Sequence, residues 1–179
     1  MTCIIGLAHE GKIYMGGDSA TLSGMDITIT ARRKVFLVGD FLIGTTGSIR
    51  MMQILRYHLS VRQQEDGEDD MRYLVVAFVE SVRDCLKKYG HAIVNNNQED
   101  IDGWFLVGYR GKLYRVTQDM QIDTYQLPFM AVGCGSDYAL GAMQALSEQV
   151  DPVQRITRAL EISAQFSAGV AAPFYVESL

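Results

Sequence analysis

The sequence has few cysteines and few histidines, and their spacing argues against several common kinds of site. The three cysteines, Cys3, Cys85 and Cys134, are odd in number and show no CxxC spacing, so neither a disulfide framework nor a zinc site is indicated. The three histidines stand far apart, without an i,i+4 pair of ligands or an obvious member of a Ser-His-Asp triad. We therefore expect a protein that requires no metal and no organic cofactor.

Long apolar runs and clusters of basic residues are also missing. No apolar stretch approaches the ~18 residues of a membrane span, and the first residues lack the basic and apolar regions of a signal peptide. The formal net charge of −5 and the lack of a Lys/Arg cluster argue against nucleic-acid binding, because contacts with phosphates need clustered positive charge. We expect a cytoplasmic protein with no membrane and no nucleic-acid partner.

The chain is rich enough in apolar residues for a substantial core. Its 179 residues are 48% apolar and 21% charged, which is typical of one globular domain, here expected to span residues 1–179. Alternating apolar residues and turn signals predict strands over 2–8, 12–18, 26–30, 34–38, 41–45, 104–109, 112–116, 121–125 and 174–177. Helical spacing predicts helices over about 48–61, 70–89, 136–146 and 151–166, with a polar loop at 95–98.

The order of these elements predicts the fold class. Strands are followed by two helices, then strands, two more helices and one strand, which favours an α+β fold over the alternating pattern of a parallel sheet. We expect a four-layer αββα sandwich in which two antiparallel sheets lie between helices. The buried stripe of the 70–89 helix is expected to contain Leu74, Val75, Phe78, Val79, Val82 and Leu86.

Thr2 is the first candidate for chemistry. Removal of Met1 by a methionine aminopeptidase would make Thr2 the N-terminal residue, and its free α-amine, with a pKa near ~8, could then act as the base that activates its hydroxyl. The strands on either side of His9-Glu10-Gly11 should form a hairpin. If its turn centres near residue 10, Thr2 faces Asp18 across the hairpin.

Several motifs carry a resemblance to a known family. Gly17-Asp18-Ser19 ends the second predicted strand, and Lys34 follows Asp18 by sixteen positions; Gly44–Ser48 and Gly133–Leu140 are glycine-rich turns before predicted helices. With Thr2, these residues resemble the proteasome β-type family of N-terminal-nucleophile hydrolases over essentially the whole chain. The chain is most similar to the simple bacterial peptidases in which threonine follows the start methionine.

The resemblance implies roles for further residues. Thr2, Asp18 and Lys34 would be catalytic, with Lys34 lowering the pKa of the attacking hydroxyl and Asp18 stabilising the lysine cation. The oxyanion amide falls on Ser48 or, if the glycines are aligned, on Gly47. The remaining implied residues are Thr21, Arg32 and Thr46 in the substrate pocket, and Cys134, Ser136 and Gln165 in support of the amine.

Two of these positions depart from the family pattern. Cys134 stands where the family commonly has a serine, and a thiol is a weaker donor and acceptor than a hydroxyl. Gln165 replaces an aspartate, and Ala168 a serine, in the Asp-x-x-Ser-Gly segment. Simpler interpretations also exist, because Asp18 and Lys34 could form a structural ion pair, and residues 44–48 could serve only as a helix cap.

The leading functional hypothesis is an N-terminal threonine peptidase without metal or cofactor. The resemblance implies a self-compartmentalising homo-oligomeric ring that cleaves peptides or unfolded proteins, with an ATPase unfoldase as a further conceivable partner. Two alternatives remain open. One is a catalytically silent, ring-forming structural subunit, and the other is a small-molecule amidohydrolase of the same nucleophile class.

Overall fold

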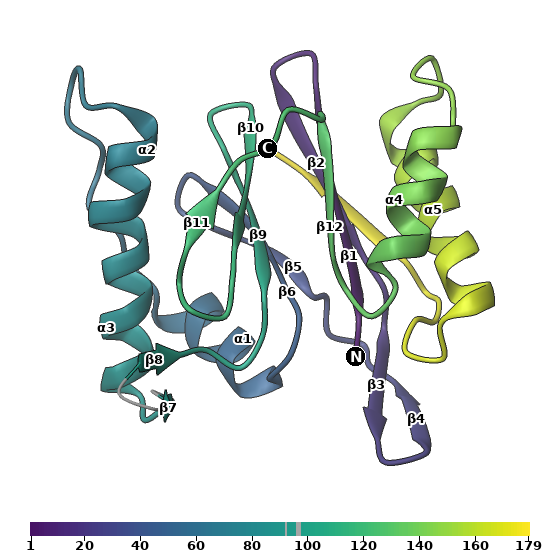
Figure 1. The fold of residues 1–179 in the computed structure, drawn as a ribbon, viewed down its shortest axis with the longest axis horizontal. Coiled ribbons are helices and arrows are strands. Elements are labelled where there is room, and N and C mark those ends of the chain that lie inside the picture. Colours follow the sequence, from purple (N-terminus) through teal and green to yellow (C-terminus); the bar gives the residue numbers. More distant parts are fainter. Residues whose placement is uncertain (92, 96–97) are drawn as a thin grey trace.

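Two antiparallel β-sheets face each other in the computed structural model, which describes residues 1–91, 93–95 and 98–179 (Figure 1). One sheet has the strand order β12-β1-β2-β13, and the other has the order β11-β10-β9-β6-β5. The first sheet consists of β1 (Cys3–His9), β2 (Lys12–Gly17), β12 (Phe129–Gly133) and β13 (Tyr175–Ser178). The second consists of β5 (Val35–Val38), β6 (Phe41–Thr45), β9 (Phe105–Tyr109), β10 (Lys112–Val116) and β11 (Ile122–Asp123).

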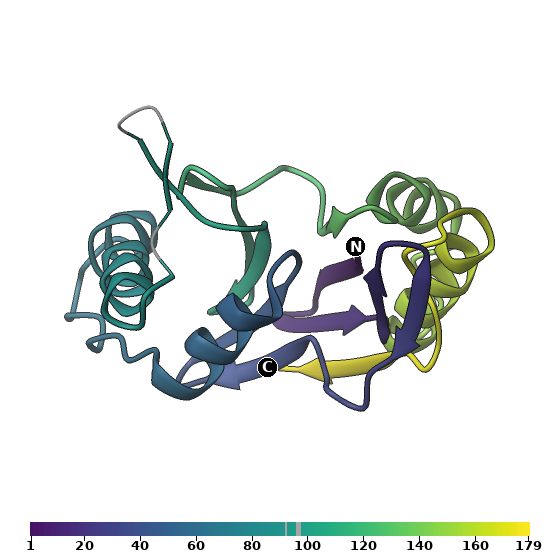
Figure 2. The same ribbon diagram turned by 90° about the horizontal axis from the view of Figure 1, so that it is seen from below.

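Helices cover the outer faces of both sheets (Figure 2). Helices α4 (Ser136–Ala145) and α5 (Pro152–Phe166) pack on the first sheet, and α1 (Ile49–His58) and the helical stretch 70–88 pack on the second. The predicted αββα sandwich of the N-terminal-nucleophile hydrolase fold is therefore confirmed. Among the described residues, none of the helices has the length and apolarity needed to cross a membrane.

The alternation of side chains along β1 explains why both of its faces are apolar. Ile4 points into the space between the two sheets, where it packs with residues such as Met15 and Leu42. Ile5 and Leu7 point to the opposite face and pack against α4 and α5. A central strand with helices on one side and a second sheet on the other is buried on both faces, so its sequence reads as a continuous apolar run.

The hairpin between β1 and β2 has a two-residue turn, with φ of 50° at Glu10 and 75° at Gly11. Both central residues are left-handed, as in the type I′ turns that match the twist of paired strands. Ile4 consequently pairs with Gly17, and Asp18 N donates to Cys3 O at 3.3 Å. The predicted register, with Thr2 opposite Asp18, is wrong by one residue because the turn is shorter than assumed.

The predicted 70–89 helix is observed, with a different geometry in its middle. It comprises α2 (Asp70–Tyr73), the π-helical segment η1 (Leu74–Val79) and α3 (Glu80–Lys88), and Asp69 caps its start by accepting from Arg72 N at 2.9 Å. Five residues of the expected stripe are buried, whereas Val75 is 46% exposed. The prediction for Val75 is wrong because i→i+5 bonding changes the angular spacing of side chains.

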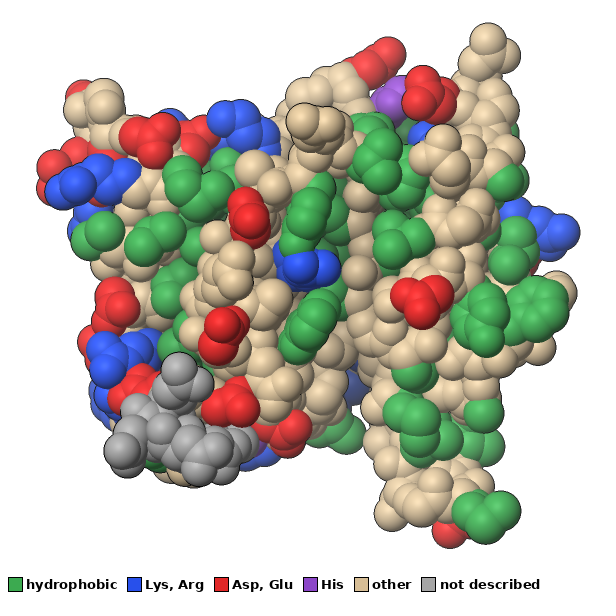
Figure 3. All heavy atoms as spheres, viewed as in Figure 1, with side chains coloured by type: hydrophobic (Ala, Val, Ile, Leu, Met, Phe, Trp, Pro, Cys, Tyr) green, Lys and Arg blue, Asp and Glu red, His purple; other side chains and the backbone are tan. Residues whose placement is uncertain are grey.

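Two small hairpins complete the described chain. Strands β3 (Ala20–Ser23) and β4 (Asp26–Ile29) form an arm beside the N-terminus that projects from the sandwich (Figure 1). This arm carries apolar side chains at its surface (Figure 3). Met25, at its turn, is fully exposed. Strands β7 (Ile93–Asn95) and β8 (Gln98–Asp100) form a pair where a polar loop was predicted; residues 96 and 97 of that loop lie outside the described residues.

Candidate active site

Three chain segments that are distant in sequence meet at one end of the two sheets. Thr2 immediately precedes β1, Asp18 immediately follows β2, and Lys34 immediately precedes β5 of the facing sheet. The start of β1 and the end of β2 lie at the same end of the hairpin because the two strands are antiparallel. All three residues are buried, with exposed fractions of 4%, 1% and 8% respectively. The structure thus brings the three predicted catalytic residues together.

The Lys34 ammonium group joins the other two. Its Nζ donates to Thr2 Oγ1 at 2.8 Å, to Asp18 Oδ1 at 2.9 Å and to the carbonyl of Ala20 at 2.6 Å. An ammonium group has three N–H donors, and all three are therefore engaged. This arrangement fixes a positive charge beside the Thr2 hydroxyl.

The Asp18 carboxylate is held from several sides. Besides Lys34, its Oδ1 accepts from Cys3 N at 2.9 Å, and its Oδ2 accepts from Ala20 N at 2.8 Å. Its side chain has no exposed surface. Two backbone N–H donors and the Lys34 ammonium group therefore hold the Asp18 carboxyl group in place beside Lys34.

Burial and charge act in opposite directions on Lys34. Desolvation lowers the pKa of its ammonium group from the ordinary value of 10.5, while the charge of Asp18 and its hydrogen bond raise the pKa. Burial is the larger influence, so the pKa of Lys34 is lower than usual.

The thiol of Cys3 is also buried near this site. Burial raises its pKa to about 12, which makes that thiol a poor nucleophile.

The main-chain nitrogen of Thr2 faces sulfur. Thr2 N donates to Cys134 Sγ at 3.3 Å, and Ser167 Oγ donates to the same sulfur at 3.4 Å. Thr2 Oγ1 donates to the carbonyl of Met1. While Met1 is attached, Thr2 N is an amide and cannot act as a base. Cys134 therefore lies next to the main-chain nitrogen of Thr2.

The structure separates the other predicted supporting residues from the amine. Gln165 is exposed on α5, and Ser136 is the first residue of α4, with Gly135 at the cap position instead. Neither side chain hydrogen-bonds to another group in the part of the chain that the structure describes. Ser167, which the sequence interpretation missed, instead donates to Cys134 Sγ, the sulfur that accepts from Thr2 N. The family's serine was aligned with Ala168; moving that alignment by one residue would have selected Ser167.

The turn before α1 offers one backbone amide to the site. Ser48 N donates to Asp102 O at 2.9 Å, and the Ser48 hydroxyl caps α1 by accepting from Arg50 N and Met51 N. Within the described residues, Gly47 N has no acceptor, and Gly47 lines the pocket beside Thr2. Of the two candidate donors that the sequence left open, Ser48 N is already engaged in the fold and Gly47 N is not, among the described residues.

Replacing Gly47 with alanine should disturb this turn strongly. Its φ is +78°, and an added Cβ would lie 2.0 Å from Asp102 O. Gly39→Ala is the matched control, because Gly39 has φ of +53° and nothing within 4 Å of an added Cβ. We expect the control to lose roughly 1–2 kcal/mol of unfolding free energy from left-handed strain alone. Gly47→Ala should lose clearly more in urea denaturation, and equal losses would contradict this account of the turn.

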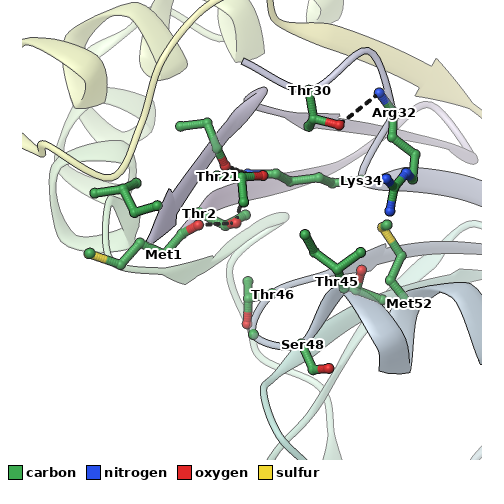
Figure 4. A pocket seen from close by; sticks show the side chains of 14 residues that line it. Met1, Thr2, Thr21, Thr30, Arg32, Lys34, Thr45, Thr46, Ser48 and Met52 are labelled. Carbon is green, nitrogen blue, oxygen red and sulfur yellow. Dashed lines mark hydrogen bonds between the residues drawn. The ribbon is translucent and has the colours of Figure 1, made fainter. Parts of the chain in front are cut away.

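The three predicted pocket residues line one cavity next to Thr2 (Figure 4). Thr21 comes from β3, Arg32 from the β4–β5 connection, and Thr46 from the turn before α1. The Thr46 hydroxyl is engaged in the fold, since it donates to Trp104 O at 2.7 Å. Thr30 and Met52 also line the cavity, and sequence reasoning had not selected them. Met52 lies in the predicted 48–61 helix, and an apolar residue in a helix gives no separate indication of a pocket.

The sandwich topology and the grouping of Thr2, Asp18 and Lys34 at the end of the sheets define an N-terminal-nucleophile hydrolase fold. Solved structures with this fold are similar over nearly the whole chain. BPH from Thiobacillus denitrificans, in complex with epoxomicin, is 22% identical with a TM-score of 0.82, covering 99% of this chain and 98% of that one. The eukaryotic HslV from Trypanosoma brucei is 17% identical with a TM-score of 0.71, at 99% and 98% coverage.

A third similar structure is Anbu, described as an ancestral beta-subunit, from Yersinia bercovieri. It is 14% identical with a TM-score of 0.67, covering 99% of this chain and 81% of that one. No family model matches the chain. At these identities the likeness establishes the fold, and to that extent it confirms the resemblance to the proteasome β-type family that the sequence motifs indicate.

Proposed function

We propose that this protein is an N-terminal threonine peptidase whose nucleophile is Thr2. The observation that carries the proposal is the 2.8 Å contact between Lys34 Nζ and Thr2 Oγ1, made while Lys34 is also paired with Asp18. A fixed positive charge beside a hydroxyl lowers the pKa of that hydroxyl and favours its attack on a carbonyl carbon. The structural neighbours BPH and HslV support the general kind of activity.

The first half of the reaction uses the amine freed by cleavage of the Met1–Thr2 bond. Thr2 Oγ1 attacks the substrate carbonyl carbon and passes its proton to the α-amine, and the oxyanion accepts a hydrogen bond from Gly47 N. Collapse of the tetrahedral intermediate breaks the C–N bond. The leaving amine takes the proton from the α-ammonium, and an ester to Thr2 remains.

In the second half of the reaction, water replaces Thr2 Oγ1 as the attacking group and hydrolyses the ester. The α-amine takes a proton from water, and the hydroxide oxygen attacks the ester carbon. Thr2 Oγ1 then leaves and regains a proton from the α-ammonium, which restores the enzyme. The hydroxyl proton that leaves with the amine product is replaced by one from water, so the enzyme is restored and the cycle needs no metal and no redox partner.

A ring of identical subunits is part of the proposal, because a peptidase that accepts many chains needs restricted access. Peptides or unfolded proteins would be the substrates, and an ATPase unfoldase would be a further partner. The second candidate function is a catalytically silent ring subunit. It is favoured by the thiol of Cys134 beside Thr2 N, in place of a stronger hydrogen-bonding hydroxyl.

Intact-mass measurement of the purified native protein tests the peptidase proposal directly. We expect a mass without Met1, cleavage of fluorogenic peptides, and a mass increase on reaction with epoxomicin, the compound seen with the Thiobacillus protein. Retention of Met1 with no cleavage would favour the silent subunit. Cleavage of small amides but not of peptides, by a protein too small to be a ring, would favour the amidohydrolase alternative.

The pH profile of peptide cleavage should be bell-shaped. The α-amine, with a pKa near ~8, must be neutral to act as the base, so kcat/KM should rise as pH approaches 8. Lys34 must be charged, and burial lowers its pKa below 10.5, so activity should fall again on the alkaline side below that value. Because Asp18 raises the pKa of Lys34, Asp18→Asn should move the alkaline limb to lower pH. An unmoved alkaline limb in this variant would contradict the assignment.

A further inference from the structure

The candidate active-site pocket carries an unusual charge. Of the described residues that line it, two are charged, Arg32 and Lys34, and both are basic. Lys34 is neutralised by Asp18, and no acidic residue lines the pocket within the part of the chain that the structure describes. The pocket therefore has a net positive charge, although the whole chain has a formal net charge of −5. Arg32 is the source of that charge.

Arg32 differs from the neighbouring arginines in having no partner for its charge among the described residues. Arg33 pairs with Glu177 and lies over the ring of Tyr175, and Arg56 donates to main-chain oxygens and lies over a phenylalanine ring. The Arg32 guanidinium has no carboxylate within ion-pair distance among residues 1–91, 93–95 and 98–179. Arg32 N donates to Thr30 Oγ1 at 3.2 Å, which links the backbone of Arg32 to the residue that follows β4. The backbone thus holds an unpaired cation at the pocket wall.

Figure 4 shows the Arg32 side chain extending across the pocket toward Met52 of α1, on the side away from Thr2. Attack by Thr2 requires the substrate carbonyl to lie between Thr2 Oγ1 and Gly47 N. The side chain of the substrate residue that carries this carbonyl is then the one nearest to the pocket. Met52 and Thr21 provide apolar and uncharged walls for the stem of that side chain, and the guanidinium lies farther along. A carboxylate at the end of the side chain would meet the unpaired cation.

We propose that the pocket selects peptides with a glutamate side chain on the residue whose carbonyl is attacked, and that Arg32 determines this specificity. The proposal rests on the proposed peptidase function. Guanidinium and carboxylate groups match in charge and in the geometry of their hydrogen bonds, so the pair forms readily where both are partly removed from water. A glutamine side chain of the same shape lacks the charge and should be cleaved less well.

The test compares two fluorogenic peptides that differ only in Glu or Gln at that residue, using the protein without Met1. We expect kcat/KM to be about tenfold higher for the Glu peptide at low ionic strength, as a partly exposed charged pair allows. High salt should reduce the ratio. Arg32→Gln should bring the Glu/Gln ratio close to one, whereas Arg33→Gln, with the same change in charge outside the pocket, should leave the ratio unchanged.

The outcomes separate failure of the inference from failure of the proposed function. Cleavage with a Glu/Gln ratio at or below one, or a ratio that Arg32→Gln does not change, would overturn the inference and leave the peptidase assignment intact. If neither peptide is cleaved, the peptidase assignment fails. Calorimetric binding of the matching Glu and Gln peptide amides to the Thr2→Ala variant then decides the pocket's preference. Equal affinities would overturn it, and tighter binding of the Glu amide that is lost with Arg32→Gln would support it.

Discussion

Thr2→Ala is expected to lower kcat/KM for peptide cleavage by roughly a thousandfold or more, because the variant lacks the oxygen that forms the ester. Thr2 Oγ1 is the hydroxyl that the Lys34 ammonium contacts, at 2.8 Å. Cys3 cannot replace it, since burial raises the pKa of that thiol to about 12. The loss should appear in fluorogenic peptide assays on protein whose Met1 has been removed.

The fold of this variant should survive. Lys34 Nζ keeps two of its acceptors, Asp18 Oδ1 and the carbonyl of Ala20, when the Thr2 hydroxyl is removed. Thr2→Ser is the matched control, because it retains the hydroxyl and loses only a methyl group, and it should keep a measurable part of the activity. Full activity of Thr2→Ala would rule out Thr2 as the nucleophile, and loss of folding measured by circular dichroism would make the activity result uninformative about the hydroxyl.

The sequence predicted the parts of the site that depend on order along the chain. Glycine and aspartate end one strand, and a lysine stands at the start of the hairpin that contains β5 and β6, so Asp18 and Lys34 lie at strand ends whatever the turn lengths are. Antiparallel pairing of the first two strands then brings the strand end with Asp18 beside Thr2. Asp18 was therefore placed near Thr2 even though the predicted register of the first hairpin was wrong, whereas Lys34 was selected from the family resemblance and its spacing of sixteen residues from Asp18.

Other features depend on three-dimensional contacts that a single sequence does not contain. The choice of Gly47 over Ser48 rests on the bond from Ser48 N to Asp102 O, which joins segments far apart in the chain. The contact of Ser167 Oγ with Cys134 Sγ depends on how the chain turns after α5. The exposure of Val75 depends on a π-helical segment that the apolar pattern did not signal. In each case the deciding interaction is non-local or breaks the regular spacing.

Lys34→Met is expected to affect both stability and activity. The substitution leaves the Asp18 carboxylate, whose side chain is fully buried, without its counter-ion. Removing one member of a buried ion pair typically costs about 3–5 kcal/mol, and we expect a loss of about that size in urea unfolding. Lys12→Met is the control, because Lys12 is exposed on β2 and has no ion pair among the described residues. The control should leave the unfolding free energy nearly unchanged.

The activity of Lys34 variants separates catalysis from a purely structural ion pair. Under conditions where Lys34→Met remains folded, kcat/KM should still be at least about a hundredfold lower, because no cation lowers the pKa of the Thr2 hydroxyl. Lys34→Arg should recover part of the stability by keeping the charge, but little activity, since a planar guanidinium cannot direct three donors to Thr2 Oγ1, Asp18 Oδ1 and Ala20 O. If activity in both variants instead follows the folded fraction alone, Lys34 serves the fold and takes no part in the reaction.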